Sequence, residues 1–288
     1  MMSEQPQGAL QLRDPVMIAA FEGWNDAGDA ATTAIEQLNL GWDSVPLAEI
    51  DPESYYDFQV SRPNTRLVDG VTRQIDWPTT KVSAARLPES VSARDVILIR
   101  GIEPNFRWRA FCEELLTIAD TYRVSSVICL GALLADVPHT RPVQVTGSAP
   151  DSAEAEQLGL TGSTYEGPTG ITGIFGDACV QRGIPAYTFW AAVPHYVAQG
   201  PHPKASVALL HRVEEVLDLP VPLGTLPDQA DQWEDEVTDI AAQDEDITAY
   251  IQTLEESSEE EVPLRPASGD AIAAEFERYL RRRGPEAG

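Results

Sequence analysis

Basic residues are scarce in this 288-residue sequence. It contains 20 lysines and arginines against 46 aspartates and glutamates, which gives a formal net charge of −26. A surface of this charge repels phosphate groups, so the composition argues against nucleic-acid binding and against docking on anionic membranes. Lysine is nearly absent, with only Lys81 and Lys204, a bias to which we attach no functional meaning.

Cysteines and long apolar runs are also few. Cys112, Cys129 and Cys179 are far apart and lie in apolar surroundings, which predicts buried free thiols in a reducing compartment. No run reaches the roughly 20 apolar residues of a membrane span. The first residues lack the apolar core of a signal peptide. We therefore expect a cytoplasmic protein that does not associate with membranes.

Familiar metal and nucleophile motifs are missing as well. Neither H-E-x-x-H nor paired C-x-x-C occurs, and there is no G-x-S-x-G nucleophile elbow. His195 and His202, which lie in a proline-rich stretch, are interpreted as loop histidines with ordinary hydrogen bonds. We expect no metal site and no cofactor.

Short apolar runs and amphipathic helical patterns alternate over most of the chain. The runs at residues 16–21, 95–100 and 126–133 are typical of strands buried on both faces of a sheet. Further strands are expected at 45–50, 73–77, 81–86, 143–147 and 185–192, and helices at 27–40, 107–122, 171–181 and 204–217. The alternation predicts an α/β fold with a largely parallel sheet covered by helices on both sides.

The pattern changes near residue 223. Apolar or small residues repeat at heptad spacing from Leu226 to Leu254, with Asp244 as the one polar position, and no lysine or arginine occurs from 228 to 261. Burying Asp244 unpaired would be costly, so we expect a kink, a break or a basic partner there. A second helix at 270–282 would complete a helical hairpin.

The heptad tail has three interpretations: a seam between copies of the chain, an arm for a partner, or a helix packed on its own domain. We divide the chain into an α/β domain, residues 1–224, and an acidic helical C-terminal domain, residues 225–288.

The segment after the first predicted strand is the most distinctive. Glu22, Asp26 and Asp29 gather at a strand-to-helix turn, the place where open α/β sheets bind ligands. One interpretation is acid–base or metal chemistry. The other is capping of the next helix by Asn25 or Asp26. Trp24 would serve as a ligand platform or an interface anchor.

Glycines recur at every third position from Gly167 through Gly170 and Gly173 to Gly176. They could cradle an anion at a helix start or allow close backbone packing. No lysine or arginine lies between residues 142 and 181, and the spacing fits neither G-x-G-x-x-G nor the P-loop. Packing is therefore the favoured interpretation.

Three segments together resemble the proteasome assembly chaperone family, in its second branch as found in actinobacteria. They are Phe21-Glu22-Gly23-Trp24-Asn25-Asp26-Ala27-Gly28-Asp29-Ala30, Tyr165-Glu166-Gly167-Pro168-Thr169-Gly170-Ile171 and Trp190-Ala191-Ala192-Val193-Pro194-His195-Tyr196. The resemblance implies a three-layer α/β/α sandwich similar to the phosphorylase/hydrolase-like fold. It also implies self-association, often as trimers in prokaryotic relatives, and a chaperone-like role in assembling other subunits.

The candidates for binding a ligand or partner are Glu22, Gly23, Trp24, Asn25, Asp26, Asp29, Glu166, Gly167, Gly170, His195 and Tyr196. Two functions follow from them. The favoured one is a non-enzymatic, homo-oligomeric protein that binds protein partners and helps to assemble another complex. The alternative is a nucleoside hydrolase or phosphorylase-like enzyme. Its acid, base and ribose-binding groups would be Glu22, Asp26, Glu166 and His195, with phosphate held by Arg100, Arg107 or Arg141.

The C-terminal sequence bears on the client. Archaeal relatives that grip the proteasome end in a hydrophobic residue, a tyrosine and one last residue. This sequence ends Arg283-Gly284-Pro285-Glu286-Ala287-Gly288, and Tyr279 lies too far upstream. We expect no docking of that kind, and the client stays open.

Overall fold

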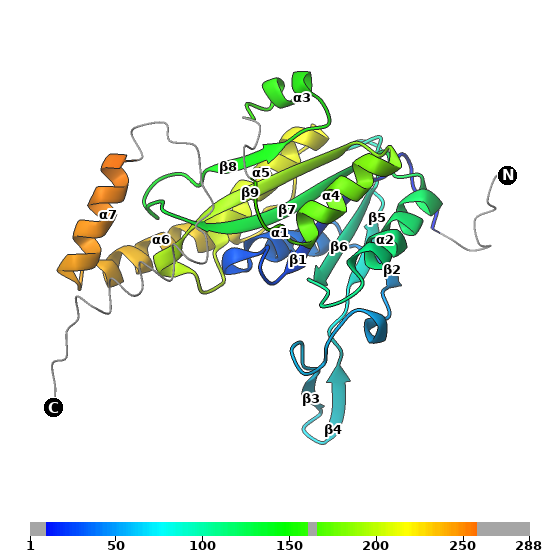
Figure 1. Cartoon of the computed structure of the whole chain (residues 1–288), viewed down its shortest axis with the longest axis horizontal. Coiled ribbons are helices and arrows are strands. Elements are labelled where there is room, and N and C mark those ends of the chain that lie inside the picture. The colour runs from blue at the N-terminus through cyan, green and yellow to red at the C-terminus, as the bar shows by residue number, and fades with distance from the viewer. Residues whose placement is uncertain (1–9, 161–165, 258–288) are drawn as a thin grey trace.

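The chain folds around one mixed seven-stranded sheet (Figure 1). The computed structural model describes residues 10–160 and 166–257. The strands are β1 (Val16–Glu22), β2 (Val45–Glu49), β5 (Lys81–Ala85), β6 (Val96–Ile102), β7 (Ser126–Ala135), β8 (Val145–Ser148) and β9 (Ala186–Pro194), in the order β2-β5-β6-β1-β7-β9-β8. Neighbours from β6 to β9 are parallel, whereas the pairs β2–β5, β5–β6 and β8–β9 are antiparallel.

Helices cover both faces of the sheet. They are α1 (Ala30–Gly41), α2 (Trp108–Tyr122), α3 (Ser152–Gln157), α4 (Ile171–Arg182), α5 (Pro203–Leu217), α6 (Leu226–Ala241) and α7 (Glu245–Ser257), with short 3-10 turns η1 (Ala27–Asp29), η2 (Pro52–Ser54) and η3 (His195–Val197). Helices α1 and α5 share one core with the sheet, and α2 and α4 share the other. This confirms the predicted three-layer α/β/α sandwich. Within the described ranges, no helix is both long and apolar enough to cross a bilayer.

The central strand β1 supplies both cores. Ile18 and Ala20 belong to the core under α1 and α5, while Met17, Ala19 and Phe21 belong to the core under α2 and α4. Successive side chains of a strand point to opposite faces, so a strand covered on both sides needs an unbroken apolar run. This requirement explains why β1, β6 and β7 were recognisable in the sequence.

Two regions differ from the sequence-based expectation. A single short strand was expected at 73–77. The structure instead has a separate two-stranded hairpin, β3 (Asn64–Val68) and β4 (Thr72–Asp76). The helix expected from residue 27 begins at Ala30, because Asp29 has a left-handed backbone (φ 52°) and η1 precedes it.

The heptad region is two helices, α6 and α7. Asp244 lies between them and accepts hydrogen bonds from the N–H groups of Asp246 (2.9 Å) and Ile247 (3.3 Å). The predicted break at Asp244 is therefore confirmed, and its carboxylate caps α7. Helix α6 packs along α5, and Leu226 belongs to the same core as α5. The expected helix at 270–282, and with it the helical hairpin, lies outside the described residues. The boundary after residue 224 stays a prediction.

All three cysteines are buried and free, as predicted. Burial raises the pKa of Cys112 to about 11 and that of Cys179 to about 12, and it raises the pKa of Cys129 well above the ordinary value. Because the thiolate is the reactive form, these side chains are inert packing groups at neutral pH.

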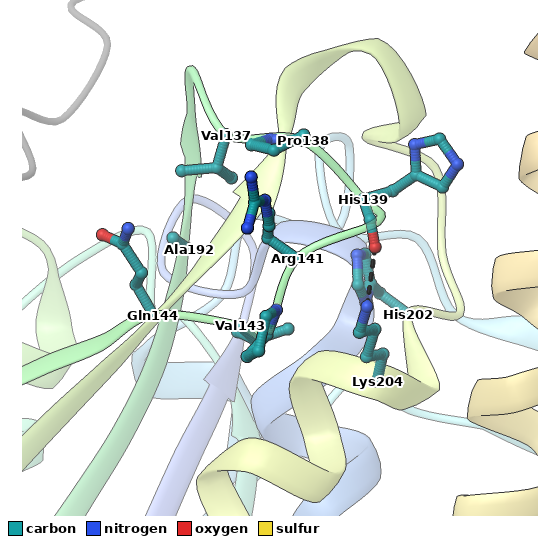
Figure 2. Close-up of a pocket in the computed structure, with 10 residues that line it drawn as sticks. Val137, Pro138, His139, Arg141, Val143, Gln144, Ala192, His202 and Lys204 are labelled. Atoms are coloured by element: carbon teal, nitrogen blue, oxygen red, sulfur yellow. Dashed lines mark hydrogen bonds between the residues drawn. The ribbon is translucent and has the colours of Figure 1, made fainter. Parts of the chain in front are cut away.

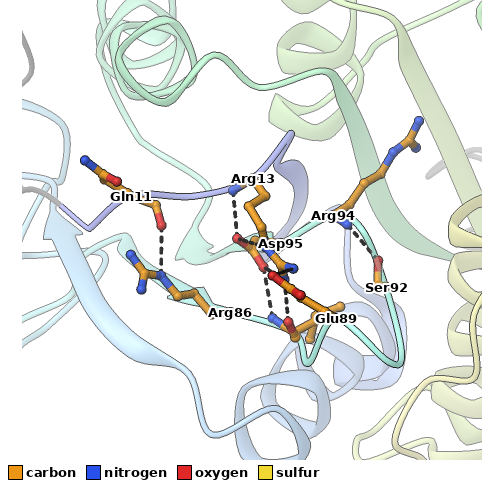
Figure 3. A network of polar contacts seen from close by, with 8 residues as sticks. Gln11, Arg13, Arg86, Glu89, Ser92, Arg94 and Asp95 are labelled. Carbon is orange, nitrogen blue, oxygen red and sulfur yellow. Dashed lines mark hydrogen bonds and ion pairs between the residues drawn. The ribbon is translucent and has the colours of Figure 1, made fainter.

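The buried carboxylate of Asp95 ties the N-terminal segment to the sheet (Figure 3). It accepts hydrogen bonds from the backbone N–H of Arg13 (2.7 Å), the Arg13 guanidinium (2.6 Å) and the N–H of Leu87 (3.0 Å). Burial alone would raise the pKa of Asp95, but the bonds from Arg13 and Leu87 lower it below the ordinary value. The backbone of Asp95 also bonds to Arg13 and Val16, which aligns the starts of β1 and β6.

We expect Asp95→Ala to destabilise the protein by about 1–3 kcal/mol, because it leaves the backbone N–H groups of Arg13 and of the buried Leu87 without their acceptor. The matched control is Glu89→Ala: the Glu89 carboxylate lies 3.7 Å from Arg13 but is 90% exposed, so its loss should change little. Urea unfolding of both variants measures the difference. Equal losses of stability in the two variants would show that the Asp95–Arg13 ion pair contributes no more than an exposed one.

Candidate functional site

An open polar pocket lies at the carboxyl ends of β1 and β6. Its volume is about 270 Å³, and it is lined by Glu22, Asp29, Thr32, Thr33, Glu36, Arg100 and Pro201. Parallel strands end at the same edge of a sheet, and this edge is where such sheets bind ligands. Of the candidates from the sequence, Glu22 and Asp29 line this pocket.

Acidic groups dominate the pocket. Arg100 forms ion pairs with Glu22 (2.7 Å) and Glu36 (2.9 Å), so its charge is already shared by two carboxylates. Burial raises the pKa of Glu22, and Arg100 partly opposes the rise. Three carboxylates against one guanidinium favour a cationic ligand group over a phosphate.

The loop after β1 is anchored by the buried side chain of Asn25. Its amide donates to Glu103 (2.8 Å), and the same carboxylate oxygen accepts from the N–H of Ile171 at the start of α4 (2.9 Å). The backbone oxygen of Asn25 accepts from the N–H of Ala132 in β7 (2.8 Å). Asn25 thus joins the loops after β1 and β6 to β7 and to the start of α4. Sequence analysis missed Glu103, because only the fold brings it to Asn25.

Gly170 packs directly against Asn25. A Cβ atom at position 170 would lie 2.0 Å from the Asn25 side-chain oxygen. Close packing, rather than an anion cradle, therefore explains this glycine. Glu166 and Gly167 are exposed in the segment that leads into α4.

Asp26 caps α1 from across the η1 turn. Its carboxylate accepts from the N–H groups of Ala31 (2.6 Å) and Thr32 (3.2 Å) and from the Thr32 hydroxyl. Burial raises the pKa of Asp26 to about 6, against the opposing effect of these bonds. The side chain is engaged at the helix start and does not line the pocket.

Each of the loops that follow β1 and β6 exposes one aromatic side chain. Trp24 is 64% exposed, and Phe106, in the loop after β6, is 50% exposed. The backbone N–H of Glu103 donates to the backbone oxygen of Glu22 (2.9 Å), so the two loops touch. Sequence analysis singled out Trp24 but missed Phe106, whose only signal was its place between a strand and a helix.

His195 and Tyr196 lie in η3 at the end of β9, two strands away from β1 in the sheet order. The Tyr196 hydroxyl accepts from the backbone N–H of His139 (2.7 Å), and His195 lies 3.2 Å from Asp136. Both rings contact Tyr250 of α7, with centroids 5.5 and 6.2 Å away. These residues hold the C-terminal helices and do not join the Glu22 pocket.

A second, narrow pocket borders this attachment (Figure 2). His202, which is buried, accepts from the N–H of Ala205 (3.1 Å) through Nδ1, and its ring packs on Trp233 of α6 at 4.0 Å. Lys204 donates to the backbone oxygen of His139 (2.7 Å) and to Glu234 of α6 (2.5 Å). Burial lowers the pKa of His202 to about 4, so this ring is neutral at pH 7.

Within residues 10–160 and 166–257, no three His, Cys, Asp or Glu side chains gather in a group that could hold a metal ion.

Comparison with known proteins identifies relatives. A sequence model of the PAC2 family matches residues 20–241. A Mycobacterium tuberculosis proteasome-assembly chaperone homologue is 57% identical, with 82% of this chain and 99% of that chain covered and a TM-score of 0.75. A PAC2 family protein from Streptomyces avermitilis is 51% identical, with the same coverage and a TM-score of 0.77.

An archaeal proteasome activator from Pyrococcus furiosus has the same fold at 16% identity. Its alignment covers 83% of this chain and 97% of that one, with a TM-score of 0.63. No curated protein matches the chain.

The Asn25 junction predicts different outcomes for two glycine substitutions in one segment. Gly170→Ala should destabilise the protein by about 1–3 kcal/mol, because the new methyl group collides with the buried amide of Asn25. Gly173→Ala is the control, since its methyl group meets only the movable hydroxyl of Thr169 and alanine favours the helix. Thermal unfolding compares the two. A neutral Gly170→Ala would show that Asn25 is not tightly held.

Asp26 predicts a pH-dependent stability difference. Its folded pKa of about 6 lies above the ordinary aspartate pKa of 3.8, so the folded state keeps the proton to higher pH than the unfolded state. The associated stability is fully present below pH 3.8 and is lost as the pH rises through 6, by about 3 kcal/mol. Relative to Asp26→Asn, the wild type should therefore lose stability between pH 4 and 7.

Urea unfolding at several pH values measures this difference. His202 has the opposite slope in the same range, because its lowered pKa favours the folded state as the pH rises. The contribution of His202 is the same in the wild type and in Asp26→Asn, so it cancels when their stabilities are compared. A wild-type advantage that grows with pH would show that the capping bonds outweigh burial.

Proposed function

Since this chain belongs to the PAC2 family, we propose that it is a non-enzymatic, chaperone-like protein that binds a protein client during the assembly of a larger complex. The client would be held at the carboxyl edge of the sheet, by the loops after β1 and β6. The proteasome is one candidate client, because the mycobacterial relative is described as a proteasome-assembly chaperone homologue.

The exposed indole of Trp24 on an anchored loop is the observation that supports this site. Its neighbour Asn25 is fully buried, and Asp26 is bonded to α1, so the backbone on one side of Trp24 is held firmly. An aromatic ring on a rigid support contributes contact area with little loss of conformational entropy. A rigid loop that exposes a tryptophan is better suited to a protein surface than to a reaction centre.

The adjoining pocket supplies a complementary polar contact. Glu22, Asp29 and Glu36 border it, so a lysine or arginine side chain of the client would find acceptors beside the aromatic surface. Trp24 and Phe106 would bind apolar groups of the same client. An apolar centre beside charged groups is the usual composition of a protein interface.

The enzymatic alternative has weaker support. A nucleoside hydrolase or phosphorylase-like enzyme needs its acid, base and ribose-binding groups at one place. Glu22 lines the open pocket, Asp26 caps α1, and His195 lies beside Asp136 and Tyr250 at the end of β9. Glu22, Asp26 and His195 therefore have three different sets of contacts and do not form one catalytic group.

We expect Trp24→Ser to weaken client binding by about 30-fold, the effect of removing a hot spot worth roughly 2 kcal/mol. The control is Leu40→Ser, an equally exposed apolar residue at the end of α1, which should bind normally. Tagged wild-type protein is used to isolate the client from native extract, and the purified pair is then titrated with each variant.

Loss of the client's assembled complex in cells that carry only Trp24→Ser would extend the result to function. Equal binding by Trp24→Ser and wild type, or recovery of nothing but copies of the same chain, would contradict the proposal. Catalytic turnover of a nucleoside that disappears in Glu22→Gln would favour the enzymatic alternative.

A further inference from the structure

The narrow pocket of Figure 2 shares no residue with the open pocket at Glu22. It is lined by the loop of residues 137–144, which connects β7 to β8, together with Ala192 of β9 and the start of α5. Its volume is about 20 Å³, which is enough for one water-sized group. A ligand here must therefore present one small atom or group, such as a halide ion or an oxygen of a carboxylate.

The side chains of fixed charge that line this pocket are both cations. They are Arg141 and Lys204, and no aspartate or glutamate among the described residues lines it. This is unusual in a chain with 46 acids against 20 bases, in which Lys204 is one of two lysines. A pocket lined by one sign of charge attracts the opposite sign, so its field favours an anion.

The buried side chain of His202 adds a hydrogen-bond donor that has no acceptor. The residue is 1% exposed, and its Nδ1 accepts from the N–H of Ala205 (3.1 Å). Because burial lowers the pKa of His202 to about 4, the ring is neutral at pH 7 and its one proton is on Nε2. Nε2 is buried and has no hydrogen-bond partner within residues 10–160 and 166–257. An unpaired buried donor is unfavourable, so an acceptor bound beside this ring would stabilise the fold.

Lys204 has an unused donor as well. Its ammonium group donates to the backbone oxygen of His139 (2.7 Å) and to Glu234 of α6 (2.5 Å). An ammonium group has three N–H donors, so one is left without an acceptor in the described part of the chain. The charge of Lys204 contributes to the lowered pKa of His202, which places the two groups near each other. The His139 ring, in contrast, points away from the pocket (Figure 2).

We propose that this pocket is a binding site for one small monovalent anion, either a halide or the carboxylate of a short organic acid. The anion would accept from Nε2 of His202 and from the ammonium of Lys204, and the guanidinium of Arg141 would add to the positive field. A water molecule can use the same donors, but only an anion also gains from the two positive charges.

The bound anion would strengthen the attachment of α6. Trp233 of α6 packs on the His202 ring at 4.0 Å, and Glu234 of α6 is bonded to Lys204. Both donors of the site thus also contact α6, so filling the site fixes the positions of the side chains on which this helix rests. We therefore expect the anion to stabilise the full chain. The site is separate from the proposed client surface at Trp24, and its failure would leave that proposal unchanged.

Titration of the full chain with sodium chloride, and separately with sodium formate, tests the site at constant ionic strength. The salt that each replaces is sodium methanesulfonate, whose anion is too large for the pocket. The chain has four histidines, so imidazole nitrogen NMR spectra contain few ring signals, and His202→Asn identifies the signal of His202. Asparagine keeps a capping acceptor at the start of α5 while it removes the Nε2 donor. The thermal midpoint is measured on the same samples.

The expected result is a saturable movement of the His202 ring signal, larger than that of the exposed His211, with a rise in thermal midpoint at the same anion concentrations. Lys204→Met should weaken the apparent affinity about 10-fold or more, the loss of one hydrogen bond to a charged group. Lys81→Met is the matched control, since it removes the other lysine from an exposed position on β5 and should respond as the wild type does. Arg141→Met replaces Lys204→Met if that variant loosens α6.

Two results would overturn the anion site. A His202 signal that neither chloride nor formate moves would show that the pocket holds water only. This measurement needs no variant beyond the one that assigns the signal. Equal responses of the charge-removing variant and of Lys81→Met would show a general effect of salt and no binding at this pocket. Saturation by chloride alone identifies a halide site, and saturation by formate identifies a site that also admits a carboxylate.

Discussion

The buried amide of Asn25 is the contact on which the candidate site depends. Asn25 bonds to Glu103, Glu103 bonds to the start of α4, and the backbone of Asn25 bonds to β7. These bonds restrict the loop to one arrangement, although the side-chain oxygen of Asn25 is buried without a hydrogen-bond partner in the part of the chain that the structure describes. Trp24, the residue before Asn25, is 64% exposed on this firmly held loop.

The acidic side chains near this loop have different structural roles. Asp26 caps α1, Glu103 joins two loops, and Glu22 shares Arg100 with Glu36. A cluster of carboxylates in the sequence can therefore arise from several separate structural needs. For the partner that we propose, the open pocket and the exposed rings of Trp24 and Phe106 in the loops after β1 and β6 remain.

The histidines form a second structural centre, at the attachment of the C-terminal helices. His139, His195 and His202 each contact α6 or α7 through a ring or a hydrogen bond. The tail is thus anchored on its inner side, while its outer side keeps its acids and Ile240 exposed. Anchoring one side of an amphipathic element leaves the other free for a further contact.

Short-range patterns in the sequence determined the layered fold, the central strands and the break at Asp244. Those features depend on the period of apolar residues and on local capping, which act over a few neighbouring positions. The candidate residues of the loop after β1 were also found this way. Their roles were decided only by the tertiary structure, because Glu103 and Gly170 come from distant segments and meet Asn25 only when the sheet is formed. The separation of His195 and Tyr196 from Glu22 likewise depends on strand order, which no local pattern encodes.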